Sequence, residues 1–286
     1  MNRFLVMALC LVFSLQTFAN EKAVEAAAAY SQRDFNEVGI QNAAKATTLY
    51  GEAIAIETVE LTKLQLMLDL ASAHYFLGTA MDKKADRKEQ HQNAMDTADA
   101  IMTTMGVDPT KAPEFTQEEV VGLLNQFDSD QELVLADAMY SKGINLAHWG
   151  NLNGIASSIG KLPKVLGLME RIEMMGYESI HEYGPYRTIG RINFVLPSVL
   201  GGDLSASERY LSDAYRSSLV TGQRYSMNAY NNIYYAETLH KSGKENQAKR
   251  LLDLLINADI ATLKDGDTPE NREALKVARE LAEDWA

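Results

Sequence analysis

The chain has 286 residues, of which 46% are hydrophobic, so it can bury the core of one large domain or two small ones. Its formal net charge is −12 at pH 7, and such an acidic surface argues against binding nucleic acid or an anionic membrane face. A single cysteine, Cys10, excludes an intramolecular disulfide and any site built from several thiolates.

The first residues have the order of a secretory signal. Arg3 gives a positive start, residues 4–13 are apolar, and small residues precede a predicted cleavage after Ala19. An apolar run of about ten residues is well short of the roughly twenty that span a bilayer. We therefore expect a signal peptide over residues 1–19 and a periplasmic mature protein. Cys10 lies inside this segment, and we do not expect lipid anchoring there.

Helical periodicity dominates the rest of the chain, and strand-like alternation is nearly absent. The six prolines fall at the boundaries of the periodic segments. The pattern predicts helices over Ala23–Phe35, Gln41–Glu57, Val59–Met81, Lys84–Met105, Gln131–Asn151, Pro163–Met175, Pro185–Val199, Ser205–Leu219, Tyr225–Lys241, Glu245–Ala258 and Pro269–Ala282.

Small and bulky residues recur at the spacing found in the second helix of a tetratricopeptide-type unit. Two segments have this spacing: Ala46, Tyr50 and Ala53, and Ala248, Leu252 and Leu255. Gly243 precedes the second segment, where a basic helix end, a glycine cap and an acidic first turn follow one another. We therefore predict an all-α fold of degenerate tetratricopeptide-like stacked helical hairpins. A plain bundle of helical hairpins is the alternative.

Residues 107–130 form the weakest part of the helical pattern. Within them, Thr116 and Glu119 have the spacing of a capping box, which predicts a short helix ending near Gln126. We expect three parts after the signal peptide, within one continuous domain: N-terminal helical repeats (20–106), a connecting segment (107–130) and C-terminal helical repeats (131–286).

The familiar signals of catalysis are missing from the sequence. There is no P-loop, no Gly-x-Ser-x-Gly turn and no Gly-x-Gly-x-x-Gly segment. No two histidines have the three- or four-residue spacing of a helical metal site; they are His74, His91, His148, His181 and His240. We therefore expect a non-enzymatic protein with no catalytic residue, metal or cofactor. An enzyme that uses carboxylates without a recognisable motif, for example one acting on glycans, is a further alternative.

Trp149, one of two tryptophans, lies among small residues and asparagines at an expected helix end. It is a candidate wall of a ligand cavity, with Asn153 supplying amide hydrogen bonds. The alternative is a packed tryptophan beside a helix end, with Gly150 or Gly154 as the left-handed residue.

The segment Tyr183–Asp203 is built as a helical hairpin. Gly184 and Pro185 predict the start of its first helix. Pro197 lacks the N–H that would bond the carbonyl of Asn193, so we expect a kink or a free carbonyl there. Gly201 and Gly202 predict the end, and Asp203 is expected to cap the next helix. Four residues share a face that we expect in the core: Ile189, Ile192, Leu196 and Val199.

Arg187 and Arg191 are one helical turn apart, with Gly190 between them. This glycine permits close approach of a neighbouring helix or of a ligand. Two guanidinium groups on an acidic protein suit a small organic anion such as a carboxylate. The alternative is that they pair with Glu178, Glu182 or acidic residues of the next helix.

Tyrosines and asparagines are unusually frequent between Tyr225 and Tyr235, with Tyr230 and Tyr234 one turn apart. This composition fits an amphipathic cavity wall, although an aromatic stripe is more often part of a core. The candidate ligand or partner contacts are Trp149, Asn153, Tyr183, Arg187, Arg191 and Tyr234.

In combination, these motifs resemble the T-component family of TRAP-type (tripartite) solute transporters. The resemblance covers approximately Gln131 to Asp259. The matching positions are Trp149, Tyr183, Gly184, Pro185, Arg187, Gly190, Pro197, Gly201, Gly202 and Asp203. Most of these positions are expected to be structural. Unlike many members, the chain has no lipidation cysteine at a suitable place, so the resemblance implies no membrane tether here.

The resemblance implies a periplasmic protein of tetratricopeptide-like hairpins that partners the transporter's solute-binding protein, without catalysis. We therefore expect binding of such a protein, together with a small organic anion. A general envelope scaffold for other proteins or peptides is the alternative function. Self-association into a homo-oligomer is also left open, because no polar capping repeat is evident.

Overall fold

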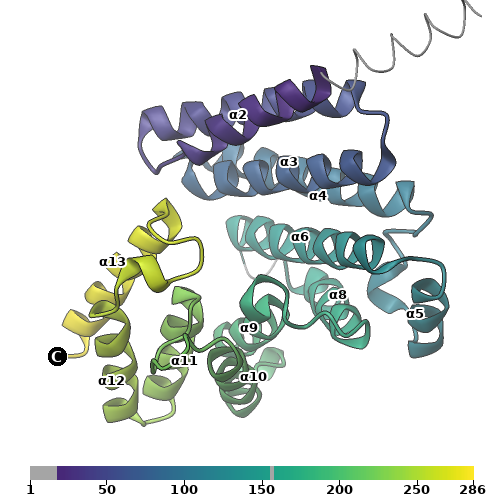
Figure 1. Cartoon of the computed structure of the whole chain (residues 1–286). Helices are drawn as coiled ribbons and strands as arrows, with labels where there is room; N and C mark the ends of the chain where they lie inside the picture. Colours follow the sequence, from purple (N-terminus) through teal and green to yellow (C-terminus); the bar gives the residue numbers. More distant parts are fainter. Residues whose placement is uncertain (1–17, 155–157) are drawn as a thin grey trace, which may run out of the picture. The chain divides into compact units, whose positions relative to one another are not determined.

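The computed structural model describes residues 18–154 and 158–286, and within these residues it is helical without any strand (Figure 1). The predicted all-α class is therefore confirmed. The chain divides into two compact units, Met1–Met175 (unit 1) and Gly176–Ala286 (unit 2). Cys10 and most of the expected signal peptide lie outside the described residues. Among the described helices, none combines the length and the apolar character needed to cross a membrane.

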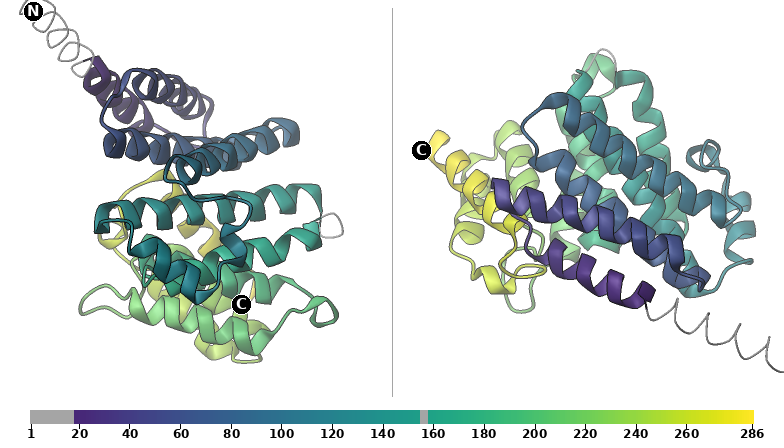
Figure 2. Two further views of the ribbon diagram at one scale, coloured as in Figure 1. Left: turned by 90° about the vertical axis from the view of Figure 1, so that its right-hand side faces the viewer. Right: turned by 90° about the horizontal axis from the view of Figure 1, so that it is seen from above.

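Unit 1 is a series of helices in which neighbours along the chain pack side by side (Figure 2). A helix over residues 18–31 comes first in the described part. The others are α2 (Glu37–Ile56), α3 (Glu60–Ala80), α4 (Lys84–Thr104), α5 (Gln117–Leu124), α6 (Ser129–Asn153) and α8 (Leu162–Met174), with the 3-10 turns η1 (Ala112–Glu114) and η2 (Ile159–Lys161). α2 packs on α3, α3 on α4, α4 on α6, and α6 on α8.

Alanines allow the first helices of unit 1 to approach closely. Ala46 and Ala53 are fully buried on α2, and Tyr50 between them is 3% exposed. They pack against Ala26 of the first described helix and Leu66 of α3. The small-bulky-small spacing read from the sequence therefore marks a buried helix face.

The expected connecting segment packs inside unit 1. Lys142 Nζ donates to the Pro109 carbonyl over 2.8 Å, and Arg171 Nε donates to the Phe115 carbonyl over 2.7 Å. Thr116 and Glu119 form the predicted capping box at the start of α5. The compact units therefore divide after Met175, and residues 107–130 belong to the body of unit 1.

Unit 2 repeats the pairing of consecutive helices. Its elements are α9 (Ile180–Val195), η3 (Ser198–Leu200), α10 (Leu204–Ser217), α11 (Ala229–Lys241), α12 (Glu245–Ile256), η4 (Ile260–Thr262) and α13 (Pro269–Asp284). α9 packs on α10, α10 on α11, α11 on α12, and α12 on α13. Leu211, Ile233 and Leu252 are at most 1% exposed and lie in one apolar cluster.

Two helix boundaries in unit 2 differ from the sequence prediction. α9 ends at Val195, so of the two outcomes predicted at Pro197, a kink or a free Asn193 carbonyl, the kink is wrong. The predicted burial of Val199 is also wrong, since this side chain is 88% exposed. The residue before a proline is driven out of the helical region, and Leu196 is extended with ψ of 135°. α11 begins at Ala229 rather than Tyr225, because the Asn228 side chain accepts from the Tyr230 N–H and caps the helix there.

The hairpin of α9 and α10 is fixed by the residues that marked it in the sequence. Gly201 has a left-handed φ of 92°, and Asp203 Oδ1 accepts from the N–H groups of Ser205 and Ala206. A Cβ on Gly190 would lie 2.5 Å from Leu211 Cγ of α10, so only glycine permits this approach. The predicted turn, cap and close helix contact are therefore confirmed.

Candidate functional site

A left-handed turn opens α9. His181, Glu182 and Tyr183 have φ of 50°, 53° and 61°, and right-handed geometry begins at Gly184, as predicted. Such a conformation costs roughly 1–2 kcal/mol for each L-residue. Hydrogen bonds offset this conformational cost, since Arg187 Nη1 donates to the carbonyls of His181 and Glu182 over 3.1 and 3.4 Å.

Asn231 of α11 completes this turn from the other side. The residue is fully buried, and its Nδ2 donates to the Glu182 carbonyl over 2.8 Å and to Ser218 Oγ over 2.9 Å. Its Oδ1 accepts from Arg187 Nη1 over 3.0 Å. The Arg187 guanidinium is therefore held by backbone and amide oxygens of unit 2. The sequence had suggested an organic anion or an acidic side chain as its partner, and neither interpretation included these oxygens.

The second asparagine of α11 also has a structural role. Asn232 Oδ1 accepts from the Ser226 N–H over 2.9 Å, and its Nδ2 donates to the carbonyls of Ser226 and Asn228, both over 3.0 Å. These bonds hold the connection between α10 and α11. The asparagine content of this segment therefore fixes a loop in place.

The structure brings two of the candidate contacts together, because Arg191 lies beside Tyr234. Its guanidinium carbon is 4.3 Å from the centre of the Tyr234 ring, and its Nη1 is 2.7 Å from Glu237 Oε2. Glu237 belongs to α11, so Arg191 pairs with an acidic residue two helices further along the chain. The Arg191 side chain remains 31% exposed.

Trp149 and Asn153 lie together at the end of α6 in unit 1. Asn153 Nδ2 donates to the Trp149 carbonyl over 2.7 Å, and Lys88 Nζ donates to Asn153 Oδ1. Lys161 Nζ is 3.4 Å from the centre of a Trp149 ring, which is a cation–π contact. Gly154 follows with φ of 90°. The candidate contacts thus fall into two groups, two residues in unit 1 and four in unit 2.

Two histidines that are remote in sequence meet in unit 1. The rings of His91 and His148 stack with centroids 5.2 Å apart, and His91 Nδ1 is hydrogen-bonded to Asn145 Oδ1 over 2.8 Å. Burial, with a smaller contribution from His91, lowers the pKa of His148 to about 4. Among the described residues, no group of three or more His, Cys, Asp or Glu is placed to hold a metal ion.

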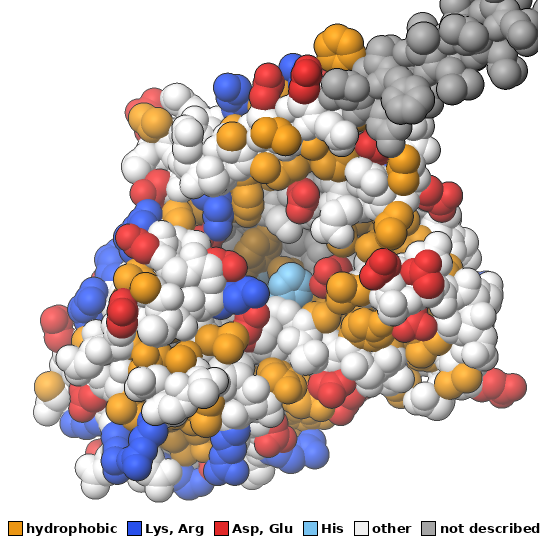
Figure 3. Space-filling model, in the orientation of Figure 1, with side chains coloured by type: hydrophobic (Ala, Val, Ile, Leu, Met, Phe, Trp, Pro, Cys, Tyr) orange, Lys and Arg blue, Asp and Glu red, His pale blue; other side chains and the backbone are white. Residues whose placement is uncertain are grey.

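A groove of about 310 Å3 in unit 2 gathers basic and apolar side chains. We call it the arginine groove; its lining residues are Tyr215, Arg216, Leu219, Arg224, Tyr235, Leu239, Gln247, Arg250, Leu251 and Leu254. They come from α10, the following loop, α11 and α12. Lys and Arg side chains gather over α10 and α12 along the lower edge of the face drawn in Figure 3. None of the described residues lining the groove carries a carboxylate.

Sequence reasoning missed this groove, because its three arginines lie on separate segments with no local motif. The one signal was on α12, where Gln247, Arg250, Leu251 and Leu254 follow the three- and four-residue spacing of a helix face. That face carries exposed Arg250 beside half-buried leucines. A basic residue inside an apolar helix stripe is therefore the sequence pattern from which the groove could have been predicted.

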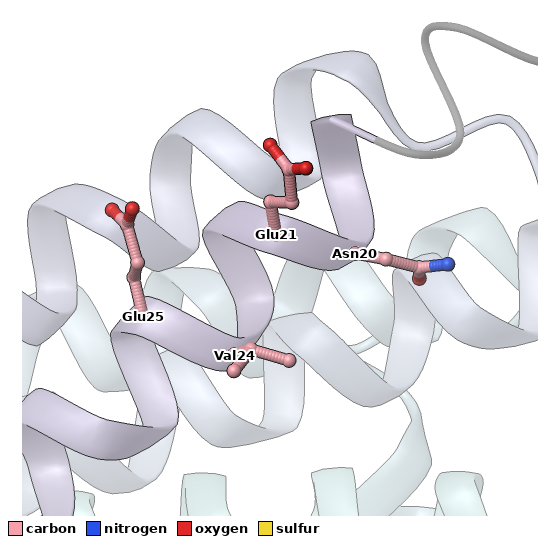
Figure 4. Close-up of a pocket in the computed structure, with 4 residues that line it drawn as sticks. All are labelled: Asn20, Glu21, Val24 and Glu25. Carbon is pink, nitrogen blue, oxygen red and sulfur yellow. The ribbon is translucent and has the colours of Figure 1, made fainter.

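A further hollow, of about 460 Å3, lies along the helix over residues 18–31. It is lined by Asn20, Glu21, Val24 and Glu25. These side chains come from a single helix, and in Figure 4 the two carboxylates point to one side while Asn20 points elsewhere. Such a hollow has no convergent polar groups and is a weaker candidate for ligand binding.

A scan against models of protein families found no match to the chain, and a search of curated proteins found none either.

Proposed function

We propose that this chain is a periplasmic, non-enzymatic protein of tetratricopeptide-like stacked hairpins. It binds the solute-binding protein of a TRAP-type transporter, as T-components do. An apolar turn between α9 and α10, inside the segment that resembles that family, carries this proposal.

The apolar turn consists of Val195, Val199 and Leu200, which are 48%, 88% and 42% exposed. Its backbone is ordered by hydrogen bonds, since Leu200 and Gly202 donate to the Pro197 carbonyl over 2.9 and 3.1 Å. A fixed turn that exposes neighbouring apolar side chains is suited to binding another protein. Its residues contribute little to the core of unit 2, so protein binding is the role that explains them.

The pairing of consecutive helices supports the repeat-like part of the proposal. Solenoid proteins stack helical hairpins so that each contacts its neighbours, and they bind partners along the resulting surfaces. The contacts from α9 through α13 follow this order. The same surfaces offer a route to self-association.

The small organic anion remains part of the proposal, with Tyr183 and Tyr234 as candidate contacts in unit 2; Trp149 and Asn153 are a separate candidate site in unit 1. Arg187 and Arg191 already have intramolecular partners. A ligand or partner would therefore contact only the exposed parts of the two guanidinium groups. Double replacement of both arginines by alanine should weaken binding of ligand or partner. Unchanged affinity for both would exclude these two residues from the site.

The apolar turn provides the sharper test. Val199→Asp with Leu200→Asp should weaken binding of the purified chain to the transporter's solute-binding protein by about tenfold or more, as measured by biolayer interferometry. Val38→Asp with Val121→Asp is the matched control, because these valines of α2 and α5 are 66% and 47% exposed. Equal loss in both double variants would contradict a specific role of the turn.

A further inference from the structure

We propose that the arginine groove is the docking site for an acidic peptide segment that carries leucine-type side chains between its carboxylates. The inference deepens the proposed function, because it assumes a protein partner and names the chemistry of the segment that the partner inserts. Its site is separate in sequence from the apolar turn.

The groove carries positive charge that the chain itself leaves without carboxylate partners. Arg216, Arg224 and Arg250 are exposed, and none forms an ion pair with any described residue. Acidic residues outnumber basic ones in this chain by 39 to 27, and Arg191 and Arg272 do pair with carboxylates. Three guanidinium groups without carboxylates therefore form a local positive site on an acidic protein. A carboxylate from outside the chain complements it.

The floor of the groove is aromatic and apolar. Tyr215 and Tyr235 are each 9% exposed, with ring centroids 5.5 Å apart, and Leu239 is 2% exposed. Leu219 is 37% exposed on the loop, and Leu251 is partly buried on α12. The Tyr215 hydroxyl donates to the Arg224 carbonyl, which ties the loop to the floor. Leu219 and Leu251 therefore supply the apolar surface that is open to an occupant, and apolar groups of the occupant would cover it.

The shape of the groove favours a peptide segment over an enclosed small molecule. Its wall on α12 runs from Gln247 to Leu254, which is about 10 Å at 1.5 Å per residue. About three residues of an extended peptide span that length, with alternate side chains facing the floor and the rim. The arginines are exposed, so an occupant keeps one side in solvent, whereas small-molecule sites bury most of the ligand.

Fluorescence anisotropy with a fluorescein-labelled peptide of alternating Glu and Leu residues tests this assignment on the full mature chain. One comparison peptide has Gln in place of every Glu, and another has Ser in place of every Leu. We expect the Glu/Leu peptide to bind about tenfold more tightly than either, because carboxylates and apolar groups are both recognised. Equal binding of all three peptides, or no binding, would overturn the proposal.

Arg216→Gln with Arg224→Gln and Arg250→Gln should weaken binding of the Glu/Leu peptide by about tenfold or more. Lys83→Gln with Lys84→Gln and Arg279→Gln is the matched control, since it removes the same charge from exposed positions elsewhere. An equal loss in both triple variants would show general attraction and overturn the proposal. A cooperative thermal transition for each variant, measured by circular dichroism, confirms that it folds.

Other occupants give different results. Octanoate that binds at micromolar concentration, with no peptide bound, would assign the groove to a small anion and overturn the proposal. Self-association that the triple arginine variant abolishes, again with no peptide bound, would assign it to a second copy of the chain. The apolar-turn variant should bind the peptide normally. Peptide binding without capture of a solute-binding protein would contradict the proposed function alone.

Discussion

Arg187 Nη1 donates to Asn231 Oδ1 over 3.0 Å, and together these side chains hold three consecutive left-handed residues at the start of α9. Asn231 lies on α11 and is fully buried, while Arg187 is partly exposed on α9. The turn therefore depends on Asn231 of α11, which lies 49 residues beyond Glu182 in the sequence. Local sequence alone does not stabilise it.

Asn231→Ala should destabilise the fold by roughly 2–3 kcal/mol, because it leaves buried groups around Glu182 and Ser218 without their donor. Urea denaturation followed by circular dichroism measures this change. Asn257→Ala, at an exposed asparagine that donates only to the Asp253 carbonyl, is the control and should stay within about 0.5 kcal/mol of the parent. Similar values for both variants would contradict the role of Asn231.

Two helical glycines should respond to alanine in opposite directions. Gly190→Ala places a Cβ 2.5 Å from Leu211 Cγ, and the resulting displacement should cost about 1–3 kcal/mol. Gly51→Ala meets nothing within 4 Å on α2, so the better helix former should raise the free energy of unfolding by roughly 0.5–1 kcal/mol. Thermal denaturation distinguishes them, and a stabilising Gly190→Ala would show that α9 and α10 are not in close contact.

His148 should make the protein sensitive to acid. Burial lowers the pKa of His148 to about 4 in the folded chain, below its usual value of 6.5. The unfolded chain therefore binds a proton first, and stability falls as the pH drops from about 6.5 to 4. His148→Gln should remove roughly 2 kcal/mol of this fall. Tyr75→Phe retains the His148 imidazole and should keep the pH dependence of stability. Loss of the pH dependence in Tyr75→Phe would contradict the assignment of the acid sensitivity to His148.

Asp69 should act in the opposite direction. Burial raises the pKa of this carboxyl from 3.8 to about 6, so folding favours its protonated form. Its contribution to stability is full below pH 4 and is lost as the pH rises through 6. Asp69→Asn should therefore stabilise the protein by roughly 1–2 kcal/mol at pH 7.5 and by much less at pH 4. Denaturation curves at both pH values measure it, and an equal effect at both would exclude titration of Asp69.

The helices and their caps could be predicted from the sequence, because their determinants are local. Periodicity, the Asp203 cap and the left-handed Gly201 each act within one or two turns of chain. The end of α9 was missed because apolar spacing continued to Val199 and was given more weight than the effect of Pro197 on Leu196. The backbone preference of the residue before proline ended the helix at Val195, and Val199 is exposed as a result.

The candidate site was less predictable, because its contacts join distant segments. Arg191 and Glu237 are 46 residues apart, and Arg187 meets an asparagine rather than an acid. The sequence showed which arginines lie on one helix face and gave no sign of what faces them. The arginine groove was hidden for the same reason, since its three guanidinium groups come together only when α10 and α12 both pack beside α11.

Retrieval of the tagged chain from the cells that produce it, under mild crosslinking and with its partners identified by mass spectrometry, tests the central claim most directly. The account predicts a TRAP-type solute-binding protein as the dominant specific partner, with markedly less of it captured by Val199→Asp with Leu200→Asp. Assembly factors or other envelope proteins as the dominant partners would contradict the transport assignment and point to a general scaffold.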